Sequence, residues 1–143
     1  MIMYAAKTTV SIEKTRIDIE AMLTRFGAAK MATFVESSMA VIVFEAKDRR
    51  LKFSLPLPTK YPSAAKLEQQ RRSRWRGLFL CIKAKLESVE SGIETFEEAF
   101  LAHVMTPDGT VYDQVRPRLA EIAKTGNMVP LLPAPHRGVD AVD

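Results

Sequence analysis

The segment from Ser63 to Ser91 repeats apolar residues at steps of three and four, the spacing that places side chains on one face of an α-helix. This stripe, which continues just past Gly92, consists of Trp75, Leu78, Ile82, Leu86, Val89 and Ile93. A helix over this segment would be about 43 Å long at about 1.5 Å per residue. The sequence therefore predicts a domain built on one long helix.

The opposite face of this helix carries small or apolar residues where a solvent-exposed face normally carries charges. It consists of Ser73, Gly77, Leu80, Cys81, Ala84, Ser88 and Ser91. Glycine inside a helix costs about 1 kcal/mol relative to alanine, and close approach of another backbone at Gly77 would compensate. We therefore expect a homodimer formed through this face. The alternative is that the last two helices of the same chain cover it.

The first half of the chain predicts a helix followed by three strands. Residues 12–26 have helical apolar spacing, with Ser11 expected as the N-cap and Gly27 as a left-handed stop. Residues 30–55 have the short apolar runs and polar breaks of a three-stranded antiparallel meander. Its segment 39–44 is rich in β-branched residues and is expected to be the central strand.

The last third of the chain predicts two more helices. Thr95 and Glu98 have the spacing of a capping box, so a third helix should start there and run to about Met105. Pro107-Asp108-Gly109 predicts a turn. A last helix should follow, which Pro117 would kink or whose true start it would mark. Its inward residues are expected to be Val111, Val115, Leu119 and Ile122.

The elements together indicate an α+β fold: a helix plus a three-stranded antiparallel meander, followed by a helical half built on the long helix. Hydrophobic residues make up 47% of the chain, enough for a core without disulfides or a metal. We expect residues 1–133 to form a single domain and residues 134–143 to form a disordered tail. The single cysteine and the lack of a membrane-length apolar run or a secretory signal favour a cytoplasmic protein.

Charge is distributed unevenly along the predicted long helix. Residues 66–85 contain seven basic residues and one acid, whereas residues 86–100 contain five acids and no base. The candidate nucleic-acid-binding residues are Arg71, Arg72, Arg74, Arg76 and Lys83 of this helix, together with Arg49 and Arg50 of the meander. Guanidinium groups bind phosphate through planar, bidentate hydrogen bonds. The alternative is that these arginines lie along the edges of the core and pair with acids elsewhere.

Trp75 lies in the middle of the basic segment and admits two interpretations. An exposed indole could stack on a base. Its place on the apolar stripe instead favours a core residue whose indole N–H finds a partner.

The sequence offers no readable catalytic or metal motif. Two histidines and one cysteine do not make a zinc site, and no glycine-rich phosphate loop or nucleophile elbow is present. Glu45-Ala46-Lys47 has the E-x-K spacing of metal-dependent nucleases, but such a site needs a second acid, for which Glu36 is the nearby candidate. We expect no enzymatic activity, no metal and no cofactor.

Four segments carry a further signal. They are Val10-Ser11-Ile12-Glu13-Lys14, Phe53-Ser54-Leu55-Pro56-Leu57-Pro58, Arg74-Trp75-Arg76, and the stretch from Ile82-Lys83-Ala84-Lys85-Leu86-Glu87 to Thr95-Phe96-Glu97-Glu98-Ala99-Phe100-Leu101-Ala102. Together they resemble a family of short uncharacterised proteins encoded in bacteriophages and prophages, over roughly residues 8–132. Members often carry a longer polar insert where this chain has the short link Thr59–Gln69. The resemblance implies a small phage protein acting in the bacterial cytoplasm and transfers no site.

These observations lead to two functional hypotheses. The first is a non-enzymatic phage accessory protein that binds nucleic acid through a basic helix. The second is a counter-defence or host-modulating protein that binds a host protein or a small signalling nucleotide. A continuous basic track would favour nucleic acid, whereas a closed pocket would favour a nucleotide.

Overall fold

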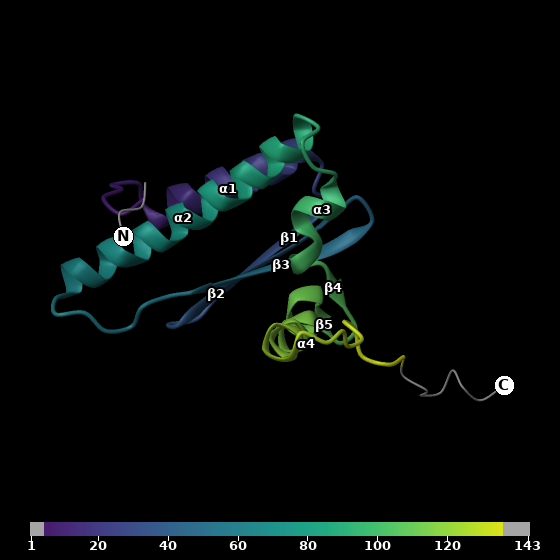
Figure 1. The fold of residues 1–143 in the computed structure, drawn as a ribbon. Helices are drawn as coiled ribbons and strands as arrows, with labels where there is room; N and C mark the ends of the chain where they lie inside the picture. The colour runs from purple at the N-terminus through teal and green to yellow at the C-terminus, as the bar shows by residue number, and fades with distance from the viewer. Residues whose placement is uncertain (1–4, 136–143) are drawn as a thin grey trace.

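The computed structural model describes residues 5–135 and has two layers (Figure 1). Helices α1 (Ile12–Phe26) and α2 (Ala64–Glu90) lie side by side over one face of an antiparallel sheet. The sheet contains β1 (Lys30–Val35), β2 (Met39–Ala46) and β3 (Arg49–Pro56), in that order. The predicted α+β fold, with its meander and its long helix, is therefore confirmed, and β2 is the central strand as expected.

The β2–β3 hairpin has a two-residue turn. Lys47 and Asp48 both have positive φ angles, of 53° and 60°, as a type I′ turn requires. This turn sets the register that pairs Ala46 with Arg49 and, at the other end, Met39 with Pro56. Successive residues of the strands therefore alternate between a face covered by α1 and α2 and a face turned away from both helices.

The core lies between the sheet and the two helices. Every second residue of β2 is buried, and Trp75, Leu78, Ile82 and Leu86 of α2 meet this face. The predicted stripe is correct up to Leu86, and Val89 is partly buried. Ile93 was expected to continue the stripe but is 78% exposed, because α2 ends at Glu90.

The helices α1 and α2 begin and end where side chains or glycine can satisfy their backbone groups. Ser11 and Ser63 accept backbone hydrogen bonds as N-caps, and Gly27 ends α1 in the left-handed conformation. The segment before α1 is held against α2, since Gln69 Nε2 donates to the carbonyls of Ala6 and Thr8.

The third helix is shorter than the sequence predicts. α3 (Phe96–Phe100) begins with the expected capping box at Thr95 and Glu98, and a 3₁₀ turn η1 (Leu101–His103) follows. The chain then becomes extended, because Val104 forms a β-bridge with Leu51 of β3. The strands β4 (Met105–Thr106) and β5 (Gly109–Thr110) form a small hairpin around the predicted turn.

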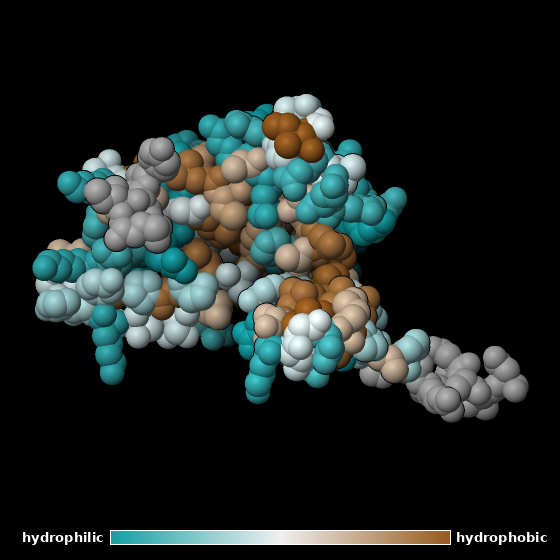
Figure 2. Space-filling model, in the orientation of Figure 1, coloured by the Kyte–Doolittle hydropathy of each residue, from teal (hydrophilic) through white to brown (hydrophobic). Residues whose placement is uncertain are grey.

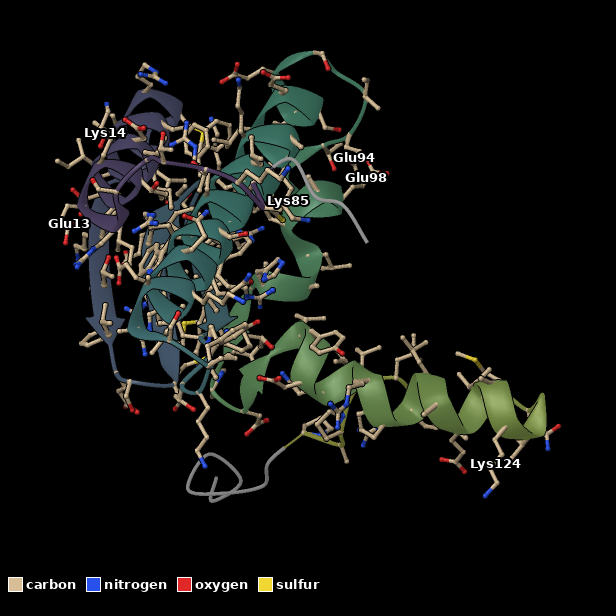
Figure 3. All side chains as sticks on the ribbon, turned by 90° about the vertical axis from the view of Figure 1, so that its left-hand side faces the viewer. Glu13, Lys14, Lys85, Glu94, Glu98 and Lys124 are labelled. Atoms are coloured by element: carbon tan, nitrogen blue, oxygen red, sulfur yellow. The ribbon has the colours of Figure 1, made fainter. Side chains whose placement is uncertain are left out.

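Helix α4 (Val111–Thr125) extends away from the rest of the domain (Figure 3). It starts at a capping box formed by Thr110 and Asp113, so Pro117 lies inside the helix rather than at its start. The predicted inward apolar face is only partly covered: Val111, Val115 and Ile122 are half-buried and Leu119 is exposed. None of its residues is buried, and Leu119 is 50% exposed. The reason is that α4 has η1 and β5 as its main neighbours and shares no core with α2.

The C-terminal tail was expected to be disordered from residue 134. Ala134 and Pro135 are exposed, and residues 136–143 lie outside the described part of the chain. Before them, residues 129–135 pass close to Pro117, Arg118 and Glu121 of α4. Figure 2 shows hydrophobic surface, in brown, on the part of the molecule that contains α4.

Candidate nucleic-acid interface

The predicted basic helix uses two of its arginines to hold the sheet. Arg71 donates to the carbonyl of Ser37 in the β1–β2 turn, and Arg74 Nε donates to the carbonyl of Pro56 at 3.1 Å. Both acceptors lie at the same end of the sheet, where Met39 pairs with Pro56. These two guanidinium groups therefore fasten the first half of α2 to the ends of the strands.

The other two arginines of this cluster pair with acids or amides. Arg72 donates to Gln69 at 2.5 Å and lies 3.6 Å from the Glu68 carboxylate. Arg76 lies 3.0 Å from Asp18 of α1, with its guanidinium 4.0 Å above the ring of Phe79.

Asp18 also accepts a hydrogen bond from Lys14 at 2.7 Å. The bond from Lys14, and then the bond from Arg76, hold the pKa of Asp18 below its usual range. Asp18 is therefore an anion that ties the positive charge of α2 to α1. Arg72 and Arg76 therefore pair with acids, as in the structural alternative, whereas Arg71 and Arg74 bond backbone carbonyls.

Trp75 is part of the core. Its side chain is 1% exposed, and the guanidinium of Arg16 lies 5.8 Å from its ring centre. Its faces are therefore covered by the protein and offer no platform for a base.

The two predicted basic clusters lie at opposite ends of the sheet. Arg49 and Arg50 follow the β2–β3 turn, whereas Arg71 and Arg74 contact the other end of the strands. The seven-residue step along β3 from Arg49 to Pro56 spans about 24 Å. Arg49 pairs with Glu97 at 2.9 Å and Arg50 with Glu45 at 3.4 Å. Lys83, the remaining candidate, is exposed.

The face of the sheet that points away from α1 and α2 is open, and we call it the outer face. Its residues are Lys30, Ala32 and Phe34 of β1, Val41, Val43 and Glu45 of β2, and Arg50, Lys52 and Ser54 of β3. Phe34 is 61% exposed, although it is a large apolar side chain on a regular strand. Lys30 and Lys52 form no ion pair within the described residues. This face combines an exposed aromatic ring with unpaired positive charge.

The outer face has several hollows, one of them of about 580 Å³ at Glu45, Arg50 and Met105 near the β2–β3 turn. A shallow one of about 300 Å³ is lined by residues that include Lys30, Phe34, Val43, Arg50 and Met105. Another, of about 420 Å³, lies between β3 and the start of α4, and its lining includes Lys52, Ser54, His103, Tyr112 and Asp113. The hairpin β4–β5 and the start of α4 therefore form a wall beside β3, and Tyr112 on this wall is 51% exposed.

His103 lies where this wall meets β3. Its Nδ1 is 3.2 Å from the carbonyl of Lys52, and its ring stacks on Phe53 with centroids 3.9 Å apart. Burial, assisted by the charge of Lys85, lowers the pKa of His103 against the opposing effect of the Lys52 carbonyl. The imidazole is therefore held mainly in its neutral form.

The predicted dimer face of α2 is divided into three parts. Ser73 is buried, one turn after the Gln69 that holds the N-terminal segment, and Ser88 donates to Glu94 at 2.6 Å. The stretch between them is open: Leu80, Cys81 and Ala84 are exposed, and no atom lies within 4 Å of a Cβ added at Gly77. The helices α3 and α4 therefore do not cover this part.

The acids nominated for a nuclease site lie far apart. Glu45 pairs across the sheet with Lys30, whereas Glu36 hydrogen-bonds to Met39 at the other end of β2. Six residues of strand separate these ends by about 20 Å. No group of three or more His, Cys, Asp or Glu side chains suited to a metal occurs within residues 5–135. Within the same residues, no helix is both long and apolar enough to cross a bilayer.

Sequence reasoning did not nominate Phe34, His103 or Tyr112. Phe34 shares one face of its strand with Lys30 and Ala32, whereas Met31, Thr33 and Val35 lie on the other face. That pattern does not say which face the helices leave open. His103 and Tyr112 join the site only because the third helix ends early and the chain returns to β3.

Comparison with protein-family models, curated protein sequences and solved structures finds no match. The resemblance to phage-encoded proteins consequently stays a prediction.

Proposed function

We propose that the protein is a non-enzymatic nucleic-acid-binding protein and that a single strand lies across the outer face of its sheet. The observation that carries the proposal is the exposed ring of Phe34 on an uncovered sheet face that also carries Lys30 and Lys52, which form no ion pair among the described residues. Aromatic rings stack on bases without regard to sequence, and lysines neutralise phosphates.

The positions of these groups on the outer face support the proposal. Ala32, Val43 and Lys52 lie in one row across the sheet, and Phe34, Val41 and Ser54 lie in the next. Neighbouring strands are about 4.8 Å apart, so Lys52 is about 10 Å from β1. Lys52 lies in the row next to Phe34, and Lys30 and Arg50 lie in the row after that, so a strand stacked on Phe34 would meet its basic contacts in the direction of the β2–β3 turn.

This arrangement moves the proposed contact from the basic helix to the sheet. Arg50 remains part of it, because its partner Glu45 is about one-third exposed and holds it only weakly. Arg49 does not, because it alternates to the other face of β3 and pairs with Glu97. The arginines of α2 support it indirectly, because Arg71 and Arg74 hold the strand ends.

The test is a titration of fluorescently labelled oligonucleotides, single- and double-stranded, at about 50 mM salt, where phosphate contacts are strong. Phe34→Ala should weaken binding of single strands by about 1–3 kcal/mol, the usual contribution of one stacked base. Tyr61→Ala is the matched control, because Tyr61 is 44% exposed in the link between β3 and α2. Lys83→Ala is the matched control for Lys52→Ala, because it removes a lysine from α2 and leaves the outer face unchanged.

The proposal fails if the native protein binds no oligonucleotide under these conditions. It also fails if the two control variants lose as much affinity as Phe34→Ala and Lys52→Ala. A loss confined to Arg72→Ala and Arg76→Ala would return the interface to α2.

The hollow beside α4 favours a second candidate, capture of a small nucleotide. Its volume of about 420 Å³ lies within the usual range for small-ligand sites, and Lys52, His103 and Tyr112 could contact phosphate and base. Calorimetric titration with mono- and dinucleotides would separate the two. Tight binding of a nucleotide, abolished by Tyr112→Ala but not by Phe34→Ala, would select this alternative.

A further inference from the structure

Strand β1 is an edge of the sheet with one neighbour, β2. The Glu36 N–H donates to the Met39 carbonyl, so Glu36 is hydrogen-bonded to the strand β2. The two-residue turn between Ala46 and Arg49 agrees with this, because it makes the even-numbered residues of β2 bond to β3 and leaves its odd-numbered residues to bond to β1. Because backbone groups alternate in direction along an antiparallel strand, the even-numbered residues of β1 bond to β2. The N–H and C=O groups of Met31, Thr33 and Val35 therefore point away from the sheet, and no backbone partner meets them within residues 5–135.

This edge also exposes apolar side chains. Met31 is 36% exposed and Val35 is 50% exposed. Natural edge strands are usually protected by proline, by a bulge, by an inward-pointing charge or by a covering segment. β1 has none of these between Met31 and Val35, and its register with β2 is regular. Such a strand is suited to pair with another strand.

We propose that β1 pairs with β1 of a second copy of this chain, antiparallel, about a two-fold axis at Thr33. The sequence around Thr33 is complementary to itself in this arrangement. The pairs are Lys30 with Glu36, Met31 with Val35, Ala32 with Phe34, and Thr33 with its own copy. Each opposes residues that stabilise antiparallel strands: opposite charges, apolar side chains and two threonines.

Charge complementarity selects this register over its neighbours. The free backbone groups belong to odd-numbered residues, so they bond only in registers where odd-numbered residues of one copy face odd-numbered residues of the other. In each such register the two-fold axis passes through one residue of β1, and the next register moves the axis by one residue. An axis at Ala32 would place Lys30 opposite Phe34, and an axis at Phe34 would place Glu36 opposite Ala32. Both leave the charges of Lys30 and Glu36 without partners, so the axis at Thr33 is favoured.

The dimer does not depend on the proposed nucleic-acid binding, but it would extend the proposed binding surface on the outer face. The two sheets would join edge to edge, so their outer faces would form one continuous surface through both copies. The two Phe34 rings would lie on either side of the axis. A single strand could then contact both copies, which would raise the apparent affinity above that of one copy.

The test is sedimentation equilibrium of the full chain over a wide concentration range. Lys30→Glu and Glu36→Lys each replace two attractive pairs of the symmetric interface by repulsive ones, and each should weaken dimerisation by about tenfold, a change of about 1.4 kcal/mol. The double variant Lys30→Glu/Glu36→Lys restores opposite charges and should dimerise as the native chain does. A monomeric native chain at every concentration, or a double variant as weak as the single ones, would overturn the proposal.

A second variant tests the backbone contact. Thr33→Pro removes an N–H that points away from β2, so the monomer should keep its far-ultraviolet circular dichroism while the dimer is lost. The paired control is Gly77→Arg/Ala84→Glu, which adds bulk and charge to the open part of the small-residue face of α2. If this control dissociates the dimer and Thr33→Pro does not, the interface lies on α2 and the proposal is wrong.

Discussion

The two faces of the sheet are made from the same three strands, yet they differ in almost every physical respect. On the inner face, Phe44, Leu51 and Phe53 are buried beneath α1, α2 and α3. On the outer face, Phe34 is exposed among Lys30, Lys52 and Arg50. The chain has two long helices to cover one face, and α4, which could have covered the other, extends elsewhere (Figure 3). A strand pattern with two different faces, one of them left uncovered by helices, therefore marks the surface that is available for binding.

Truncating one aromatic residue on the core side of the sheet and one on its outer face should change the free energy of unfolding by very different amounts. Trp75→Ala should lower the free energy of unfolding by about 3–5 kcal/mol, because it opens a large cavity in the core. Phe34→Ala should change it by less than about 0.5 kcal/mol, as is usual for exposed positions. Urea unfolding followed by circular dichroism measures both. An equally large loss for Phe34→Ala would show that the outer face is packed after all.

A second comparison separates arginines that build the fold from lysines that are free to bind. Arg71→Ala/Arg74→Ala removes two hydrogen bonds to backbone carbonyls and should lower stability by about 1–3 kcal/mol, from about 0.5–1.5 kcal/mol per bond. Affinity for oligonucleotides should stay near that of the native protein. Lys52→Ala should behave in the opposite way. If instead the arginine variant loses affinity and keeps its stability, then α2 is the binding surface.

The salt dependence of oligonucleotide binding should change by a smaller amount between lysine variants of the outer face and of α2. Each phosphate contact with a single strand contributes about 0.7 to the slope of log affinity against log salt. Lys52→Ala should therefore reduce the slope by about 0.7, whereas Lys83→Ala should leave it unchanged. Binding measured at several salt concentrations gives both slopes. Equal slopes for the native chain and Lys52→Ala would remove Lys52 from the interface.

A smaller effect is expected on the pH dependence of stability, through His103 at the border between the two faces. The pKa of His103 is lowered in the folded protein from the usual 6.5, mainly by burial, so the unfolded chain binds the proton more readily. The stability associated with neutral His103 is complete above pH 6.5 and is lost as pH falls through the lower folded-state pKa. His103→Gln should flatten the stability profile in this window. Unfolding curves at a series of pH values would show it.

Two carboxylates provide the contrast at lower pH. The pKa of Asp18 is lowered chiefly by its bonds with Lys14 and Arg76, and that of Glu98 by its bonds with Thr95. Their contribution is present above the usual carboxylate range and is lost below it, so it does not overlap with the His103 window. If the free energy of unfolding of His103→Gln still falls between pH 7 and about 5, the pH dependence in this window does not come from His103.

Much of the fold was predictable from local patterns. The β-branched run of β2 and the capping residues Ser11 and Thr95 are short-range signals that the structure confirms. The end of the third helix was not predictable in this way. Residues 101–105 continue an apolar helical pattern, and only the bridge between Val104 and Leu51, distant in sequence, makes the chain extended there.

The candidate site was less predictable than the fold. The positive charge of residues 66–85 is visible in the sequence, but the acceptors Ser37 and Pro56 that bind it are not, because they come from other elements. Val41 and Val43 are as apolar as the buried residues that alternate with them. The residue pattern of β2 therefore does not show which of its two faces the helices cover.

Helix α4 has a consequence for how the molecule opens. A 15-residue helix with no buried residue gains little from tertiary packing, and isolated helices of this length are only marginally stable in water. Its amide hydrogens should therefore exchange with solvent through local opening events that leave the sheet and α2 intact. Global unfolding and the loosening of α4 are then separate transitions. We therefore expect α4 to release and re-form while the sheet and α2 stay folded.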